Sequence, residues 1–138
     1  MAGTDTQLIE AWLRGWDTHD IEGLIAVFSD DCMYEDVPTG VVNKGQGELR
    51  TFAQAWLSAV PDAWAKLVSS CAAGGHGAAE WEFGGTHRGD LPGMPASGRT
   101  MVIRGQSAFD FADGKIKRCC DYWDLAAVLR QLGFMTAP

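Results

Sequence analysis

The stretch of sequence that decides the fold is residues 101–123, MVIRGQSAFDFADGKIKRCCDYW. It holds two runs in which apolar and polar side chains alternate, separated by Ala112-Asp113-Gly114-Lys115. Asp-Gly between two alternating runs is a strong signal for a β-hairpin, because both residues tolerate the positive φ that the turn requires. The sequence therefore predicts antiparallel strands over residues 99–111 and 115–123.

Three more strands are predicted outward from this hairpin. Residues 63–73 and 78–88 show the strand pattern, and the Gly- and Pro-rich segment from Gly89 to Gly98 is typical of a loop at a strand end. A short strand is predicted from Cys32 to Val37, where Pro38, Thr39 and Gly40 end it.

Helices are predicted at both ends of the chain. A first helix follows Thr4, which has capping-box spacing to Gln7, and Asp20 can cap a short second helix. Apolar residues at helical spacing over 49–60 indicate a third helix, and Asp124 caps a last one that ends at a glycine. Helices first and long antiparallel strands after them predict an α+β fold.

We expect a single domain, residues 1–138, shaped as a cone whose curved, mostly antiparallel sheet wraps around the N-terminal helices. A length of 138 residues suits one domain with its own core. Strands long enough to curl around helices leave an internal pocket, which is a natural place for a small apolar ligand.

The charge of the chain argues against two classes of partner. Eleven basic and eighteen acidic residues give a net charge of −7, whereas nucleic acids and anionic membranes are bound by basic patches. No apolar run approaches the roughly 20 residues of a membrane span. The opening MAGTDTQLIE has neither the basic start nor the apolar stretch of a leader. We expect a cytoplasmic protein without nucleic-acid or membrane partners.

The cysteines do not have the spacing of a metal site. Among Cys32, Cys71, Cys119 and Cys120, only the last two are close in sequence, and adjacent strand residues point to opposite faces. We expect reduced, mostly buried thiols, no metal site and no cofactor.

Side-chain alternation along the strands predicts the lining of the pocket. It places seven residues around one cavity: Trp81, Phe83, His87, Ile103, Phe109, Asp121 and Trp123. By the same alternation Ser107 faces inward, as do Tyr34 and Asp36 on the first strand.

Asp121 is the main catalytic candidate, because burial raises the pKa of a carboxyl and so suits it to proton transfer near neutral pH. The structural alternative is a helix cap or a pair with Arg118 or Arg130. Asp36 is the second candidate, or else an aspartate that forms the turn before Val37. His87 is either a pocket acid/base or a structural histidine. Tyr34 is suited to hydrogen-bond a ligand oxygen, or packs with its hydroxyl at the edge. Ser107 has no evident His and acid relay, so we do not expect a nucleophile.

Three segments, GGTHRGDLPGMPASGR, FADGKIKRCCDYWD and LRQLG, resemble the SnoaL-like polyketide cyclases of the nuclear transport factor 2-like superfamily. That resemblance implies a cystatin-like α+β barrel and a homodimer through the outward sheet face. It also implies that Asp121 is the acid/base of an intramolecular aldol closure. The family's histidine and glutamine on the preceding strand fall on Ser107 and Gly105.

Two sister families share other motifs. DIEGLIAVFSDDCMYED is similar to the opening of the ketosteroid isomerases, whose base falls on Asp36, whereas their oxyanion-hole residues fall near Trp12 and Ser107. MYED and CCDYWDL resemble the limonene-epoxide hydrolases, whose water-holding residues fall on Tyr34 and Asp36 and one catalytic aspartate on Asp121. Their arginine has no counterpart here.

The sequence thus predicts an enzyme that moves protons on an apolar, carbonyl-bearing molecule. Trp81, Phe83, Ile103, Phe109 and Trp123, with Tyr34 and Ser107, are the expected substrate-binding residues. Epoxide hydrolysis and ketosteroid-type isomerisation remain alternatives. A binding module without catalysis is the alternative of a different class, since this fold also carries such domains.

Overall fold

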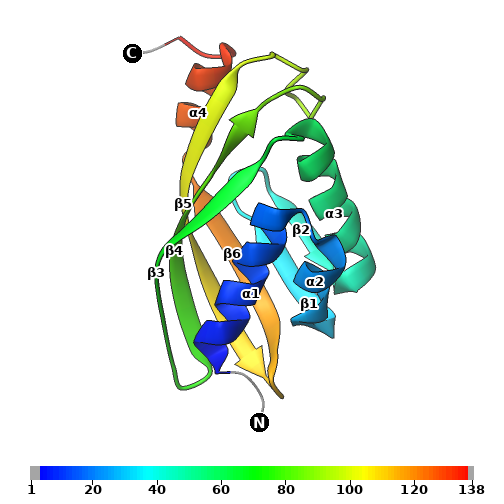
Figure 1. Cartoon of the computed structure of the whole chain (residues 1–138), viewed down its shortest axis with the longest axis vertical. Coiled ribbons are helices and arrows are strands. Elements are labelled where there is room, and N and C mark those ends of the chain that lie inside the picture. Colours follow the sequence, from blue (N-terminus) through cyan, green and yellow to red (C-terminus); the bar gives the residue numbers. More distant parts are fainter. Residues whose placement is uncertain (1–3, 137–138) are drawn as a thin grey trace.

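The computed structural model describes residues 4–136, which form four helices and one six-stranded sheet (Figure 1). In chain order the elements are α1 (Asp5–Thr18), α2 (Ile21–Ala26), β1 (Phe28–Asp36), β2 (Val41–Lys44), α3 (Gly45–Ala59), β3 (Trp64–Ala73), β4 (His76–Thr86), β5 (Thr100–Ala112), β6 (Lys115–Trp123) and α4 (Leu125–Leu132).

The strand order in the sheet is β2-β1-β6-β5-β4-β3. β1 and β6 pair in parallel, and the other four pairs are antiparallel. In Figure 1 the long strands form a curved layer, α1, α2 and α3 lie on one side of it, and α4 lies beside the first residues of β5. The predicted α+β architecture is confirmed. Within the described residues the sheet stays open and does not close into a barrel.

The predicted turn and caps are present. Asp113 and Gly114 both have positive φ, 53° and 73°, as a type I′ turn requires. Thr4 makes a capping box with Gln7, and Asp20 accepts a hydrogen bond from the backbone of Gly23. Asp124 caps α4 through the backbone N–H of Ala127, and Gly133 closes that helix with φ 85°.

The strand β2 is absent from the sequence-based prediction. Its four residues follow the turn after Asp36 and pair antiparallel with the end of β1. Val41 and Val42 are exposed at the edge of the sheet. Only Asn43 of its four residues is buried, so this short edge strand has no alternating apolar pattern to reveal it.

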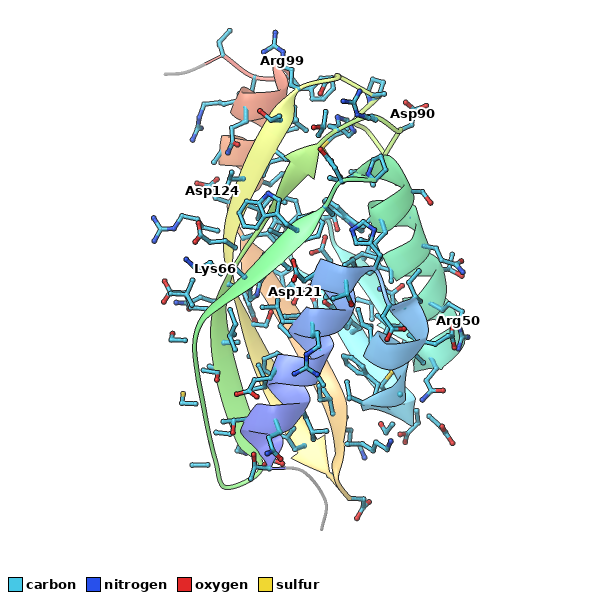
Figure 2. The ribbon with its side chains drawn as sticks, in the orientation of Figure 1. Arg50, Lys66, Asp90, Arg99, Asp121 and Asp124 are labelled. Atoms are coloured by element: carbon cyan, nitrogen blue, oxygen red, sulfur yellow. The ribbon has the colours of Figure 1, made fainter. Side chains whose placement is uncertain are left out.

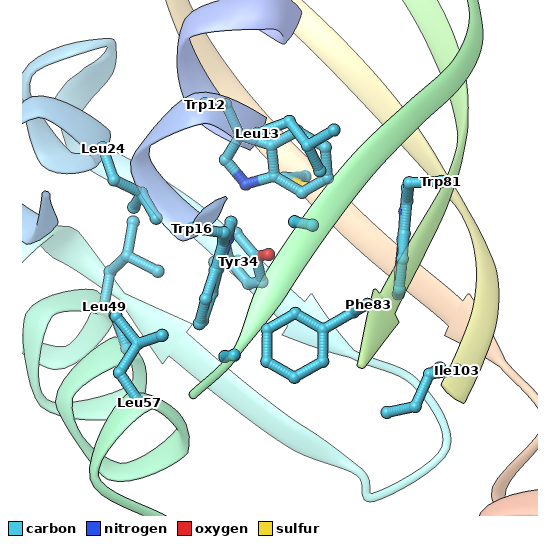
Figure 3. Close-up of a cluster of buried hydrophobic side chains, with 14 of the residues drawn as sticks. Trp12, Leu13, Trp16, Leu24, Tyr34, Leu49, Leu57, Trp81, Phe83 and Ile103 are labelled. Carbon is cyan, nitrogen blue, oxygen red and sulfur yellow. The ribbon is translucent and has the colours of Figure 1, made fainter. Parts of the chain in front are cut away.

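The core lies between the helices and the inner face of the sheet (Figure 3). Trp12 and Trp16 of α1 are nearly inaccessible, as are Leu24 of α2 and Leu49 of α3. Among them the ring of Trp16 packs against Phe83 of β4, and Figure 3 shows Leu24 and Leu49 on the helix side of the cluster, away from Trp81. No helix formed by residues 4–136 is long and apolar enough to cross a membrane.

Candidate active site

A cavity of about 50 Å³ lies between the first and third helices and the inner face of the sheet. Eight of its twelve lining residues are aromatic, two are aliphatic and two are aspartates. The lining consists of Trp12, Leu13 and Trp16 from α1, Tyr34 and Asp36 from β1, Phe52 and Trp56 from α3, Trp81 and Phe83 from β4, Ile103 from β5, and Asp121 and Trp123 from β6.

The parallel pairing of β1 with β6 brings the two aspartates together. Asp36 and Asp121 are direct partners in the register, although 85 positions separate them in the sequence. Side-chain alternation directs both into the cavity, where Asp36 is 1% exposed and Asp121 7% exposed. The inward orientation predicted for Tyr34, Asp36 and Asp121 is confirmed.

Both oxygens of Asp121 accept hydrogen bonds from buried side chains. The Tyr34 hydroxyl donates to Oδ2 at 2.6 Å, and the Ser107 hydroxyl donates to Oδ1 at 2.5 Å. The Cys119 thiol lies 3.5 Å from the same Oδ1. Ser107 in turn accepts a hydrogen bond from the indole N–H of Trp81 at 2.9 Å. Since each carboxylate oxygen has two lone pairs, these contacts hold the group in place and leave it able to accept a proton.

Burial raises the pKa of Asp121 to about 7. Loss of hydration destabilises the charged form and outweighs the opposing effect of the hydrogen bonds from Ser107 and Tyr34. The charge of Asp36 raises the pKa further. The same burial raises the pKa of Tyr34 and of Cys119 well above their ordinary values, so both remain protonated donors.

The structural alternatives for Asp121 are not met. Asp124 provides the cap of α4, and in residues 4–136 Asp121 forms no salt bridge with Arg118, Arg130 or any other cation. In Figure 2 Asp121 lies inside the molecule, and the labelled Arg50 and Arg99 lie at its periphery.

Asp36 both lines the cavity, as a catalytic candidate would, and helps to form the turn after β1. Its Oδ1 accepts a hydrogen bond from the Trp123 indole at 2.7 Å, and Thr39 donates to its Oδ2. Its backbone carbonyl accepts the N–H of Gly40 at 3.0 Å, which closes the turn before β2. Burial raises the pKa of this carboxyl too, and the hydrogen bonds from Thr39 and Trp123 oppose the rise.

His87 is not part of the cavity lining, so its predicted place beside Asp121 is wrong. β4 ends at Thr86, and the alternation already shifts near Gly85, which has φ 152°. The His87 ring is fully buried and hydrogen-bonded to the hydroxyl of Ser97, while its backbone pairs with Arg99. His87 therefore belongs to the loop between β4 and β5, which lies at the α4 end of the molecule (Figure 1).

Phe109 and Ser107 also lie outside the lining, contrary to the prediction for Phe109. Phe109 is buried with its ring against Trp12 and Phe111. Ser107 sits behind Asp121 and reaches the cavity through that carboxyl. The other five predicted wall residues line the cavity as predicted, namely Trp81, Phe83, Ile103, Asp121 and Trp123.

Sequence reasoning did not identify the five wall residues contributed by helices, which are Trp12, Leu13, Trp16, Phe52 and Trp56. Their signal is an apolar stripe at helical spacing, which is the same for a residue in the core and for one at a cavity wall. Between Thr4 and Thr136, no three His, Cys, Asp or Glu side chains gather as a metal ion would need.

The family comparison matches residues 6–132 to the model of the SnoaL-like polyketide cyclases. Among curated proteins, none matches this sequence. The match covers nearly all of the chain, from the second residue of α1 to the last residue of α4.

Several solved structures share the fold. TsrD from Streptomyces laurentii is 28% identical, with a TM-score of 0.84 over 94% of this chain and 95% of that one. A hypothetical protein of ketosteroid isomerase-like fold from Catenulispora acidiphila, solved with trimethylamine, is 20% identical, with a TM-score of 0.83 over 98% and 100% of the two chains. A proposed polyketide cyclase from Pseudomonas putida is 24% identical, with a TM-score of 0.82 over 94% and 98%.

Proposed function

This chain belongs to the SnoaL-like polyketide cyclase family, and we propose that it is a cofactor-independent acid/base enzyme acting on a hydrophobic, carbonyl-bearing small molecule. The observation that carries the proposal is Asp121, a buried carboxyl in an aromatic cavity whose pKa is raised to about 7. A group with that pKa can both take up and release a proton at neutral pH.

The proposed reaction is an intramolecular aldol-type ring closure. The Asp121 carboxylate takes a proton from the carbon next to a carbonyl, and the electron pair of the C–H bond forms an enolate. The enolate carbon attacks a second carbonyl of the same molecule and forms the new C–C bond. Protonated Asp121 then returns the proton to the alkoxide that results. Tyr34 and Ser107 hold the carboxyl in place through both steps.

The indole N–H of Trp12 is a suitable donor to the developing oxyanion. Trp12 lines the cavity, and in the described part of the chain its buried N–H makes no hydrogen bond of normal geometry, although it lies near enough to the Tyr34 hydroxyl to oppose the rise in that group's pKa. A buried donor without a partner costs free energy, which a ligand oxygen would recover. An oriented donor stabilises negative charge most as that charge develops in the transition state.

The alternative functions differ in whether they use this proton abstraction. A ketosteroid-type isomerase would share the first step, with Asp36 as a second candidate base. An epoxide hydrolase would need a cation to orient its carboxylates, and the wall positions Trp81 and Phe83 supply none. A binding module would need the cavity but no proton transfer, so proton transfer is the step to test.

The test is deuterium exchange of β-tetralone, an apolar bicyclic ketone with acidic protons next to its carbonyl. Proton NMR in deuterium oxide follows the exchange, and tryptophan fluorescence follows binding. We expect the protein to accelerate exchange and Asp121→Asn to slow it by about two to four orders of magnitude, with binding little changed. Asp31→Asn, which removes an exposed carboxyl on β1, is the matched control.

Each outcome decides between the hypotheses. Binding without exchange would contradict the acid/base function and favour a binding module. Failure to bind the ketone would contradict the proposed ligand class. Exchange that survives in Asp121→Asn would remove Asp121 from the reaction.

A further inference from the structure

Several aromatic side chains of the cavity wall pack against one another edge to face. The rings of Trp56 and Phe83 are 90° apart with centroids at 6.1 Å, and those of Trp56 and Trp123 are 89° apart at 5.8 Å. Trp16 meets Phe83 at 90° and 6.0 Å. In such edge-to-face contacts the rim of one ring meets the face of its neighbour. Because eight of the twelve lining residues are aromatic, the wall of the cavity is rich in π-electron density, which attracts a cation.

The carboxylates that line this cavity are negatively charged when ionised and have no cationic partner. Asp36 and Asp121 are the charged members of the wall, and the lining residues from α1, α3, β4 and β5 are all uncharged. In the part of the chain that the structure describes, neither aspartate takes part in a salt bridge. Neutral donors hold both carboxylates, with Trp123 and Thr39 on Asp36. Buried charges in proteins are ordinarily paired, so a cationic ligand group would complete this site.

The size of the space favours a compact group. The enclosed space of about 50 Å³ accepts a compact group, and because the cavity is open on one side, a larger ligand can extend outward from it. Phe52, Trp56 and Trp123 are half-buried, whereas Trp12, Tyr34 and Trp81 are buried, so the opening lies on the side of the first three. A larger ligand would therefore place a small head among the rings and extend outward past Trp56 and Trp123.

We propose that this cavity recognises an alkylammonium group, held by cation–π contacts with Trp16, Trp56, Phe83 and Trp123 and by the charge of Asp36 and Asp121. The ligand class is a small molecule with a methylated or otherwise compact amine. The inference rests on the proposed role of the cavity as the ligand site, and it does not depend on the proton chemistry of Asp121.

The experiment compares two ligands that differ in charge alone. Choline carries a trimethylammonium head, and its uncharged carbon isostere has the same shape with carbon in place of nitrogen. Tryptophan fluorescence and saturation-transfer NMR measure both dissociation constants at low salt and about pH 8, where Asp121 is ionised. We expect choline to bind at least tenfold more tightly, a difference of about 1.4 kcal/mol.

Substitutions in the cavity wall test whether the preference for choline over its isostere arises there. Asp36→Asn and Asp121→Asn should each reduce the ratio of the two constants several-fold, and Asp31→Asn should not. Trp56→Leu should weaken choline more than the isostere, because leucine keeps an apolar wall but has no π-face. Trp64→Leu, which changes an exposed indole outside the lining, is its control.

The preference should also fall as the pH is lowered. Asp36 and Asp121 titrate within the wall, and burial keeps Tyr34 and Cys119, next to Asp121, protonated. Protonation of the two aspartates therefore removes the attraction.

Absence of choline binding, or binding of the isostere as tight as that of choline, would overturn the inference. If β-tetralone exchange persists in that case, the proposed acid/base function stands alone. If choline is preferred but no exchange occurs, the cation site stands and the acid/base function fails.

Discussion

Replacing Asp121 by asparagine should change how stability depends on pH. The carboxyl is buried without a cation, and its pKa in the folded protein is about 7, against about 3.9 for an aspartate in an unfolded chain. The folded state therefore binds this proton more tightly than the unfolded state. The stabilising effect of protonation is fully present below about pH 4 and is lost as the pH rises through about 7.

The size of the effect follows from the difference between the two pKa values. Three pH units at 1.36 kcal/mol each give about 4 kcal/mol of lost stability once Asp121 is ionised in the folded state. Asparagine cannot ionise, so the variant lacks this loss. Asparagine also changes the hydrogen bonds to Tyr34 and Ser107, which shifts its stability by an amount independent of pH. The raised pKa of Asp36 gives the free energy of unfolding a pH dependence of the same sign in the wild type and in Asp121→Asn. Most of that contribution therefore cancels when the two proteins are compared.

Urea unfolding followed by tryptophan fluorescence measures this difference. The sequence isoelectric point of about 4.7 makes the range from about pH 5.5 to about pH 8.5 the practical one, because solubility is lowest near zero net charge. Over that range the free energy of unfolding of Asp121→Asn should gain about 2 kcal/mol relative to the wild type. The control Asp31→Asn should track the wild type. Curves for Asp121→Asn and wild type that stay parallel would show that Asp121 has an ordinary pKa, and the reasoning from burial would be refuted.

Three other substitutions test the surroundings of Asp121. Ser107→Ala removes a donor to Asp121 and leaves the Trp81 N–H unpaired, so the pKa of Asp121 should rise in carbon NMR titrations and stability should fall by about 1–3 kcal/mol in urea. Gly105→Ala places a methyl group against the Trp81 ring, which should cost about 1–3 kcal/mol in the same assay and weaken β-tetralone binding. Trp12→Phe removes the unpartnered N–H, so exchange of β-tetralone should slow by roughly two orders of magnitude while its binding is retained.

Much of the fold could be predicted because its signals are local. The Asp113-Gly114 turn fixes the pairing of β5 with β6, and the pairing places Ser107 opposite Asp121. Alternation along each strand then predicts which side chains face inward, as it did for Asp121 and Tyr34. The caps at Thr4 and Asp124 mark helix starts by their own side-chain hydrogen bonds.

What the sequence did not reveal depends on contacts between distant segments. The hydrogen bond from Tyr34 to Asp121 exists because β1 lies parallel to β6, and no local pattern specifies that neighbour. His87 was misplaced because alternation holds only while a strand continues. Thr86, which precedes His87, is itself buried and held by Asp62, so two successive residues point into the protein where alternation would allow only one.

The two proposals are coupled through the protonation of Asp121. A cationic ligand group that binds ten times more tightly to the ionised carboxyl must, by reciprocal linkage, lower its pKa by one unit, from about 7 to about 6. Asp121 would then be mostly a base at neutral pH whenever such a ligand is bound, whereas an uncharged ligand would leave it about half protonated. Asp36 acts in the opposite direction, because its charge beside Asp121 raises that pKa. The pairing of the two acids across β1 and β6 thus keeps Asp121 responsive to the charge of the ligand, at a cost in stability that the asparagine variant would measure.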